Sequence, residues 1–243
     1  MVESGQRGIL FITGTGTGVG KTIVTAALAA LADAAGQRVA VVKLAQTGVQ
    51  PGQHGGPGSD PPDLTTITRL SGVTDTHELA RFPDPLSPEA AARVSGLPPV
   101  DFARARAVID DLAGTRDLVL IEGAGGLLVR YDAAGATIAD LAAALDAPAL
   151  LVTAAGLGTL NHTALTLEAL AARKIISAGI VIGSWPDRPG LAELANLTDL
   201  EVVAGGPLAG LLPAGAGALD RRAFLAVATA GLTPSLGGTR GRR

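Results

Sequence analysis

One stretch, GTGTGVGKT from Gly14 to Thr22, constrains the fold of this chain more than any other. The apolar run before it, residues 8–13, predicts a buried strand, and the Ala-rich segment 22–35, closed by Gly36, predicts a helix. Glycines at such a junction let backbone N–H groups fold around phosphates at a helix N-terminus. Lys21 adds a positive charge for the phosphates, and the Thr22 hydroxyl can bind Mg²⁺. The stretch therefore predicts a phosphate-binding loop, although the common pattern G-x-x-x-x-G-K-[ST] would need glycine at position 15, where this chain has Thr15. We expect the nucleotide to contact Gly16, Thr17, Gly18, Val19, Gly20, Lys21 and Thr22.

Strand and helix patterns alternate along the rest of the chain. Apolar runs predict strands at 38–43, 117–122, 149–153, 178–184 and 201–204, and helices are expected from Asp63, within 87–114, and at 137–145, 159–172 and 219–230. A Gly- and Pro-rich stretch, 48–62, predicts a loop, and Asp63 is expected to cap the helix that follows it. This alternation is typical of a doubly wound α/β domain with a mostly parallel sheet, similar to P-loop NTPases. We expect one such domain over residues 1–232 and a flexible tail over 233–243.

Composition excludes several kinds of protein. The chain has no cysteine, so thiol catalysis, disulfides and cysteine-based zinc sites are excluded. Its formal net charge is −3, and the run 240–243 (RGRR) is its only basic cluster, so nucleic acid is not an expected partner. The longest apolar stretch, 141–157, is interrupted by Asp146, Pro148 and Gly156, so no membrane-spanning segment is expected. We expect a cytoplasmic protein.

Two carboxylates and a second lysine follow predicted strands or the glycine-rich loop. Glu122 ends the strand 117–122, Lys43 ends the strand 38–43, and Asp63 follows the loop 48–62. Open α/β sheets bind ligands at the carboxyl ends of their strands, and Mg²⁺ prefers oxygen ligands. We therefore expect Lys43 to face the phosphates and Glu122 and Asp63 to bind Mg²⁺ with Thr22. Each could instead be an ordinary strand-end or helix-capping side chain.

In order and spacing, five segments resemble dethiobiotin synthases: GTGTGVGKT, VVKLAQTG, IEGAGGLLV, GLGTLNHT and GSWPDRPG. The SWPD stretch is most similar to that of actinobacterial members. The resemblance implies a cyclo-ligase that joins CO₂ to 7,8-diaminononanoate, with ATP as co-substrate and Mg²⁺ as cofactor, in biotin biosynthesis. It also implies that a carbamate is phosphorylated and is then attacked by the neighbouring amine.

The resemblance also assigns roles to residues. It implies that Lys21 and Lys43 act in catalysis, and that the substrate contacts Thr17, Lys43, Thr47, Gly158, Thr159, Leu160 and Asn161. In the family the turn 158–161 comes from the partner subunit, so the resemblance implies a homodimer with shared active sites. The nucleotide base is expected near Gly183, Ser184, Pro213, Ala214 and Gly215. Many members have an asparagine aligned with Gly183 that pairs with adenine. Because glycine has no side chain, we expect CTP, GTP and UTP to be accepted as well as ATP.

Two other classes share the glycine-rich loop. Cobyrinate-type amide synthases need a glutamine-handling domain with a catalytic cysteine, and this chain has neither. ATPase switches like ParA and MinD usually carry an additional lysine early in the loop, and residues 14–19 contain none. The second class stays open as an alternative to the ligase.

Overall fold

The computed structural model describes residues 8–49 and 61–241, in which the core is a seven-stranded parallel sheet. Its order is β4-β2-β6-β1-β7-β8-β9. The strands are β1 (Ile9–Gly14), β2 (Val39–Lys43), β4 (Thr76–Glu78), β6 (Leu118–Glu122), β7 (Ala149–Thr153), β8 (Ser177–Trp185) and β9 (Gly210–Pro213). A separate parallel pair consists of β3 (Gln46–Thr47) and β5 (Arg81–Phe82). The predicted parallel α/β fold is confirmed.

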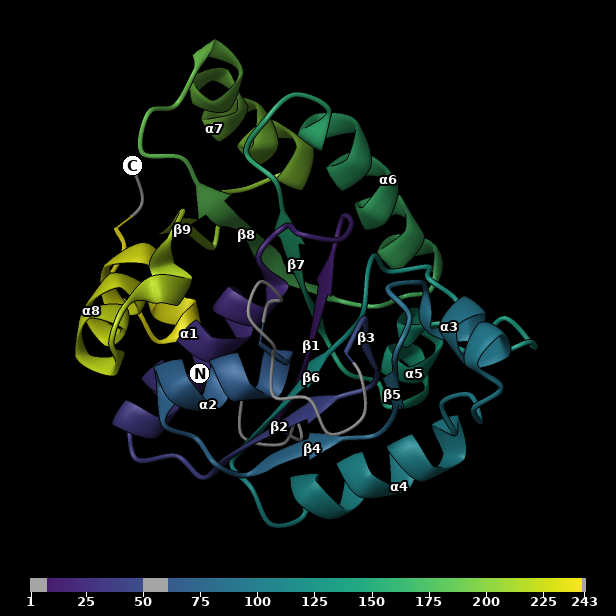
Figure 1. Cartoon of the computed structure of the whole chain (residues 1–243). Helices are drawn as coiled ribbons and strands as arrows, with labels where there is room; N and C mark the ends of the chain where they lie inside the picture. The colour runs from purple at the N-terminus through teal and green to yellow at the C-terminus, as the bar shows by residue number, and fades with distance from the viewer. Residues whose placement is uncertain (1–7, 50–60, 242–243) are drawn as a thin grey trace.

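Helices cover both faces of this sheet (Figure 1). One layer contains α1 (Lys21–Ala34), α2 (Asp63–Ser71) and α8 (Arg221–Gly231), which share a hydrophobic core. The opposite layer contains α3 (Pro88–Ser95), α4 (Phe102–Ala113), α5 (Ile138–Ala144), α6 (Thr159–Ala172) and α7 (Leu191–Ala204). Parallel strands need such crossovers, and burial on both faces explains why these strands read as continuous apolar runs.

Sheet register already brings two of the predicted site residues together. Along the pair β2–β6, Lys43 lies directly opposite Glu122. Strand β1 lies between β6 and β7, so the glycine-rich loop that follows β1 emerges at the same carboxyl edge. Strands β2, β6 and β4 lie on one side of β1 and β7, β8 and β9 on the other, so the order of the strands reverses at β1. Such a switch point is where open α/β sheets bind ligands.

Two predictions about secondary structure are wrong. Residues 201–204 (EVVA) are the last turn of α7, which ends before Gly205 in the left-handed conformation. Their β-branched valines suggested a strand, but they continue a 14-residue helix that packs against α6 and buries Leu200. The last strand is instead β9, whose four residues include both Gly and Pro. Asp63 is the first residue of α2 and not its cap, because Pro62 occupies the cap position.

The segment after α8, expected to be a flexible tail, has defined contacts. A 3-10 turn covers Pro234–Leu236, and the N–H groups of Thr239 and Arg240 donate to the carbonyls of Thr229 and Leu232. Residues 1–7, 242–243 and most of the predicted loop 48–62, namely 50–60, lie outside the described residues. Within the described part of the chain, no helix has both the length and the hydropathy needed to cross a bilayer.

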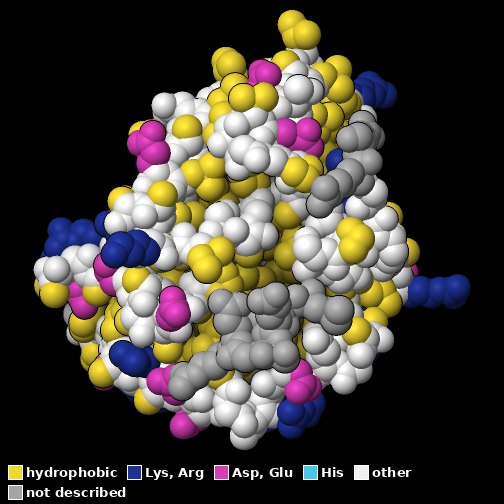
Figure 2. All heavy atoms as spheres, turned by 180° about the vertical axis from the view of Figure 1, so that it is seen from behind, with side chains coloured by type: hydrophobic (Ala, Val, Ile, Leu, Met, Phe, Trp, Pro, Cys, Tyr) yellow, Lys and Arg dark blue, Asp and Glu magenta, His cyan; other side chains and the backbone are white. Residues whose placement is uncertain are grey.

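The layer that contains α6 and α7 leaves large apolar side chains exposed. Leu157, before α6, is 94% exposed, and Leu191 and Val202 of α7 are 86% and 76% exposed. In the view from behind, hydrophobic side chains gather in the central hollow and at the top of the molecule, where Figure 1 places α7 (Figure 2). Exposed apolar area of this kind is typical of a surface that contacts another molecule.

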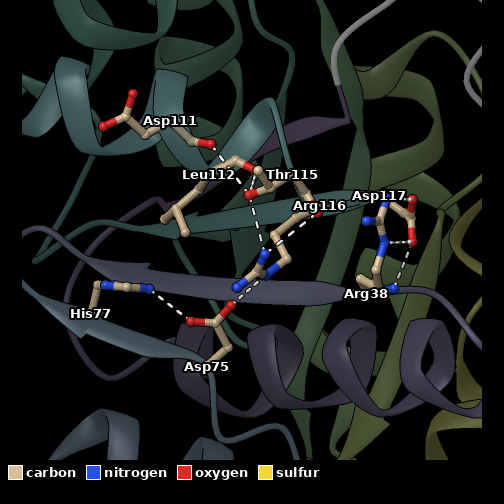
Figure 3. A network of polar contacts seen from close by, with 8 residues as sticks. All are labelled: Arg38, Asp75, His77, Asp111, Leu112, Thr115, Arg116 and Asp117. Carbon is tan, nitrogen blue, oxygen red and sulfur yellow. Dashed lines mark hydrogen bonds and ion pairs between the residues drawn. The ribbon is translucent and has the colours of Figure 1, made fainter.

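Ion pairs connect the strands at the amino-terminal end of the sheet, opposite the carboxyl edge from which the glycine-rich loop emerges (Figure 3). Asp75 contacts His77 Nε2 at 2.8 Å and Arg116 Nε at 2.6 Å, which ties the start of β4 to the turn before β6. Arg38, just before β2, forms a two-pronged pair with Asp117, just before β6. These contacts support the register of β4, β2 and β6, which sets Lys43 beside Glu122 at the other end.

Candidate active site

A cleft of about 1160 Å³ opens at the carboxyl edge of the sheet. It lies beside the glycine-rich loop and the start of α2, as a switch-point site should. Its lining includes nine residues that the sequence singled out: Thr17, Gly18, Gly20, Lys21, Thr22, Lys43, Thr47, Asp63 and Glu122. One cavity therefore collects the predicted phosphate, metal and catalytic residues, although they come from four separate segments of the chain.

The glycine-rich loop has the backbone that a phosphate-binding turn requires. Gly18 and Gly20 have φ angles of 75° and 97°, and Gly20 caps the N-terminus of α1. Residues with a side chain rarely adopt such positive φ angles, so glycine is needed at both positions. The Lys21 ammonium folds back and donates to the Gly16 carbonyl at 2.8 Å. This loop and its lysine form a positively charged cradle at a helix N-terminus.

A cluster of buried charges lies next to the loop. Lys43 Nζ is 2.5 Å from Asp63 Oδ2 and 2.8 Å from Glu122 Oε1, and it donates to the Gly123 carbonyl at 3.1 Å. The Thr22 hydroxyl donates to the same Glu122 Oε1 at 2.9 Å. Thus the three predicted metal ligands and Lys43 converge on one point.

Burial and charge act differently on the two lysines. Burial, and after it the charge of Lys43, lower the pKa of Lys21 to about 8, because Glu122 and Asp63 offset these effects only in part. Burial also acts against the charged form of Lys43, but Glu122 and Asp63 outweigh it and hold the pKa of Lys43 above its ordinary value. Lys43 therefore carries its charge at neutral pH. The pKa of Lys21 lies close enough to neutral pH for an arriving phosphate to change the protonation of this lysine.

Two residues that sequence reasoning missed support this cluster. The buried Tyr131 hydroxyl accepts a hydrogen bond from the Ala124 N–H at 2.7 Å, which holds the turn after Glu122. Its ring packs edge-on against Phe102, with centroids 5.7 Å apart. The Gln46 side chain accepts from the Asp63 N–H at 3.0 Å and so fixes the start of α2. Gln46 lies in the LAQTG segment beside Lys43, which is a usable signal, but nothing local marks Tyr131.

The turn 158–161 lies outside this cleft. Gly158, with φ of 92°, caps α6, and none of Gly158, Thr159, Leu160 and Asn161 is among the described residues that line the cavity. The buried Thr153 hydroxyl at the end of β7 holds the start of α6. It forms hydrogen bonds with the hydroxyls of Thr159 at 2.7 Å and Thr163 at 2.8 Å. The turn is therefore rigidly placed but does not complete the site of its own subunit.

The predicted base-binding segments lie together at the side of the cleft. The Ala214 N–H donates to the Trp185 carbonyl, which joins the turn after β9 to the end of β8. Gly217 and Ala218 of this turn line the cavity, whereas Gly183, Ser184, Pro213, Ala214 and Gly215 do not. The Arg69 guanidinium donates to the carbonyls of Gly217 and Leu219 and braces the turn from α2.

Gly183 has a packing role that the sequence did not reveal. A Cβ atom there would lie 2.2 Å from the Val19 carbonyl oxygen and 3.0 Å from the Gly20 Cα. Strand β8 thus packs directly against the backbone of the phosphate-binding loop, which leaves no space for a side chain. The position has no side chain for a base because it supports the loop.

This parallel sheet, with a glycine-rich loop and a Lys-Thr pair opening the first helix, defines a P-loop nucleotide-binding α/β protein. A family model described as an AAA domain matches residues 9–215. The chain is 63% identical to the ATP-dependent dethiobiotin synthetase BioD of Frankia casuarinae, over 95% of this chain and 94% of that protein. It is 59% identical to the protein of that name from Rhodococcus jostii, over 91% and 93% of the two chains. The chain belongs to the dethiobiotin synthetase family.

Solved structures of low sequence identity share the fold. The septum site-determining protein MinD of Pyrococcus horikoshii matches with a TM-score of 0.58 and 19% identity, over 91% of this chain and 94% of that one. A ParA family ATPase of Chlorobium tepidum matches with a TM-score of 0.56 and 16% identity, over 96% and 97%. At this identity the likeness concerns the fold alone, so the ParA- and MinD-like alternative has no support beyond architecture.

Proposed function

We propose that the protein converts 7,8-diaminononanoate, CO₂ and ATP to dethiobiotin, ADP and phosphate in biotin biosynthesis. The observation that supports this chemistry best is the convergence of Lys21, Lys43, Asp63 and Glu122 in one cleft beside the phosphate-binding loop. Such an arrangement suits phosphoryl transfer, which needs positioned charge and no enzyme nucleophile. The near full-length identity to proteins named dethiobiotin synthetase supports the substrate and the product. We place this enzyme in the cytoplasm.

The proposed reaction proceeds in three steps. One substrate amine adds to CO₂ and loses a proton, which gives a carbamate. A carbamate oxygen then attacks the γ-phosphorus of ATP, and ADP leaves. The second amine attacks the carbonyl carbon of this mixed anhydride, phosphate leaves, and the amine nitrogen loses a proton to solvent as the cyclic urea closes. Lys21 and Lys43 stabilise the negative charge on the transferring phosphoryl group and the carbamate, and Thr17 and Thr47 orient the substrate.

The residues present fit a Mg²⁺ ion. Glu122 Oε2 is buried and has no hydrogen-bond partner among the described residues, so this oxygen is available to a cation. Asp63, Glu122 and Thr22 supply the hard oxygen ligands that Mg²⁺ prefers. When bound with ATP, Mg²⁺ neutralises part of the phosphate charge.

We also propose a homodimer in which each turn 158–161 completes the partner's site. Two observations support this: the turn lies outside its own cleft, and Leu157 beside it is almost fully exposed. The N-terminus of α6 would then offer its N–H groups to the substrate carboxylate. Light scattering should give a dimer at assay concentration, and Asn161→Ala should weaken diaminononanoate binding while leaving ATP binding largely intact. A fully active monomer would contradict this assembly.

Product analysis tests the activity directly. The protein is incubated with diaminononanoate, bicarbonate, ATP and Mg²⁺, and dethiobiotin is sought by mass spectrometry, with matched reactions that lack ATP or diaminononanoate. We expect dethiobiotin and ADP in equal amounts only in the complete reaction. ATP hydrolysis that does not depend on diaminononanoate, without dethiobiotin, would favour the ATPase switch instead.

A further inference from the structure

The Lys43 ammonium occupies the space between the two carboxylates assigned to Mg²⁺. It contacts Asp63 Oδ2 at 2.5 Å and Glu122 Oε1 at 2.8 Å, and its side chain is only 4% exposed. A cation that binds both carboxylates must therefore share them with a charged lysine or displace it. A metal ion on these carboxylates would lie close to the Lys43 ammonium, and two cations that close repel each other strongly in a buried site.

The oxygens of Glu122 are used unequally. Oε1 accepts from both Lys43 and Thr22, whereas the buried Oε2 has no partner among the described residues. Buried carboxylate oxygens are normally hydrogen-bonded, so an unpartnered one indicates a ligand still to be bound. Lys43 thus satisfies only part of the carboxylate cluster.

Formal charges explain when that ligand can enter. Lys21 and Lys43 balance Asp63 and Glu122, so the four-residue cluster sums to zero. Lys21 lines the same cleft as Lys43, Asp63 and Glu122, so these charges act on one another. A free divalent cation would add two positive charges to a neutral, buried cluster. A nucleotide brings negative phosphates that can accept the Lys43 ammonium and compensate the metal.

We propose that Lys43 holds the place of the divalent cation, so that the cation binds Asp63 and Glu122 together only when nucleotide phosphates draw the Lys43 ammonium away. This inference rests on the metal ligands given under the proposed function. Its consequence is that free Mg²⁺ binds poorly and that metal and nucleotide enter together. Lys43 then has two positions, one on the carboxylates and one on the phosphates.

Binding of Mn²⁺, used as a probe for Mg²⁺, tests the proposal without turnover. Electron paramagnetic resonance of free Mn²⁺ is recorded during titration of nucleotide-free wild type and Lys43→Met, which keeps the side-chain length and removes the charge. We expect the variant to bind Mn²⁺ at least about tenfold more tightly, a factor that corresponds to ~1.4 kcal/mol. Added ATP should tighten Mn²⁺ binding by a larger factor in wild type than in the variant. Mn²⁺ affinities within about twofold of each other without nucleotide would overturn the proposal.

Two further variants separate the possible explanations. Lys21→Met removes the same charge, but its ammonium donates to Gly16 and not to a carboxylate, so its Mn²⁺ affinity should rise much less. An equal rise would show a general effect of net charge and overturn the specific role of Lys43. Lys43→Gln keeps a hydrogen-bond donor near the carboxylates and replaces Lys43→Met if that variant does not fold.

The assignment of the metal ligands has its own control. Asp63→Asn, added to Lys43→Met, should abolish the gained Mn²⁺ affinity. If the gain persists, Asp63 is not a ligand and the proposed metal site fails. If Asp63→Asn weakens Mn²⁺ binding in both backgrounds but Lys43→Met changes nothing, the ligands stand and only the place-holding role of Lys43 is wrong.

Discussion

Replacing Gly183 with alanine should disturb the phosphate-binding loop, although Gly183 itself has no side chain that could contact a phosphate. The added Cβ would lie 2.2 Å from the Val19 carbonyl oxygen, 2.7 Å from Val152 Cγ1 and 3.0 Å from the Gly20 Cα. Backbone atoms cannot rotate away as a side chain can. Either strand β8 or the loop must shift to restore ordinary contact distances.

The size of the effect follows from overpacking in a dense interior. Extra atoms forced into a packed core typically cost about 1–3 kcal/mol. For a chain of this length, each kcal/mol lowers the melting temperature by about 2–4 °C, so a decrease of roughly 2–12 °C is expected. If the loop takes up the shift, the same energy weakens ATP binding by about 5- to 150-fold.

Two measurements check this expectation. Thermal unfolding is followed for wild type and Gly183→Ala, and ATP binding is measured by calorimetry at fixed Mg²⁺. Gly206→Ala is a matched control, because a Cβ there would meet no atom within 4 Å. The control should match wild type in both assays. A Gly183→Ala protein with wild-type melting temperature and wild-type ATP affinity would refute the packing argument.

Four other outcomes follow from the site and the ion pairs. Lys21→Ala and Lys43→Ala should each lower steady-state turnover on the order of 10²-fold or more, as loss of a preorganised charge does, and near-normal turnover would remove that lysine from the mechanism. CTP, GTP and UTP should support dethiobiotin formation at rates within roughly tenfold of the rate with ATP, at equal subsaturating concentration. A preference for ATP above about a hundredfold would indicate a side chain that recognises adenine. Tyr131→Phe should lower the free energy of unfolding in urea by about 1–3 kcal/mol, because the Ala124 N–H loses its acceptor; an unchanged value would mean that water replaces the hydroxyl. Although burial acts the other way, hydrogen bonds from Arg116 and His77 hold the pKa of Asp75 below its ordinary value of 3.8. The contribution of Asp75 to stability is therefore present above about pH 4 and is lost as the pH falls further, so the stability difference between wild type and Asp75→Asn should shrink from pH 7 to pH 3.

The sequence by itself determined the features that depend on short stretches of chain. Strand β1, the glycine-rich loop and helix α1 follow from an apolar run, glycines that tolerate positive φ, and a Lys-Thr pair, all within residues 9–34. The alternation of apolar strands and helices was enough to predict a parallel sheet and its ligand-binding edge. These predictions succeed because periodicity and backbone freedom are local properties.

Only the tertiary structure decided how distant residues meet. It gave EVVA to a helix and GLLP to the last strand, because the packing of α7 outweighs the propensity of four residues. It placed Lys43 on both carboxylates, Tyr131 beneath the turn after Glu122, and Gly183 against the loop. Lys43 and Glu122 are 79 residues apart in the chain, and strand pairing in the sheet brings them together. No local pattern encodes that contact, because it arises from the burial of helices on both faces of the sheet and the register that this burial imposes.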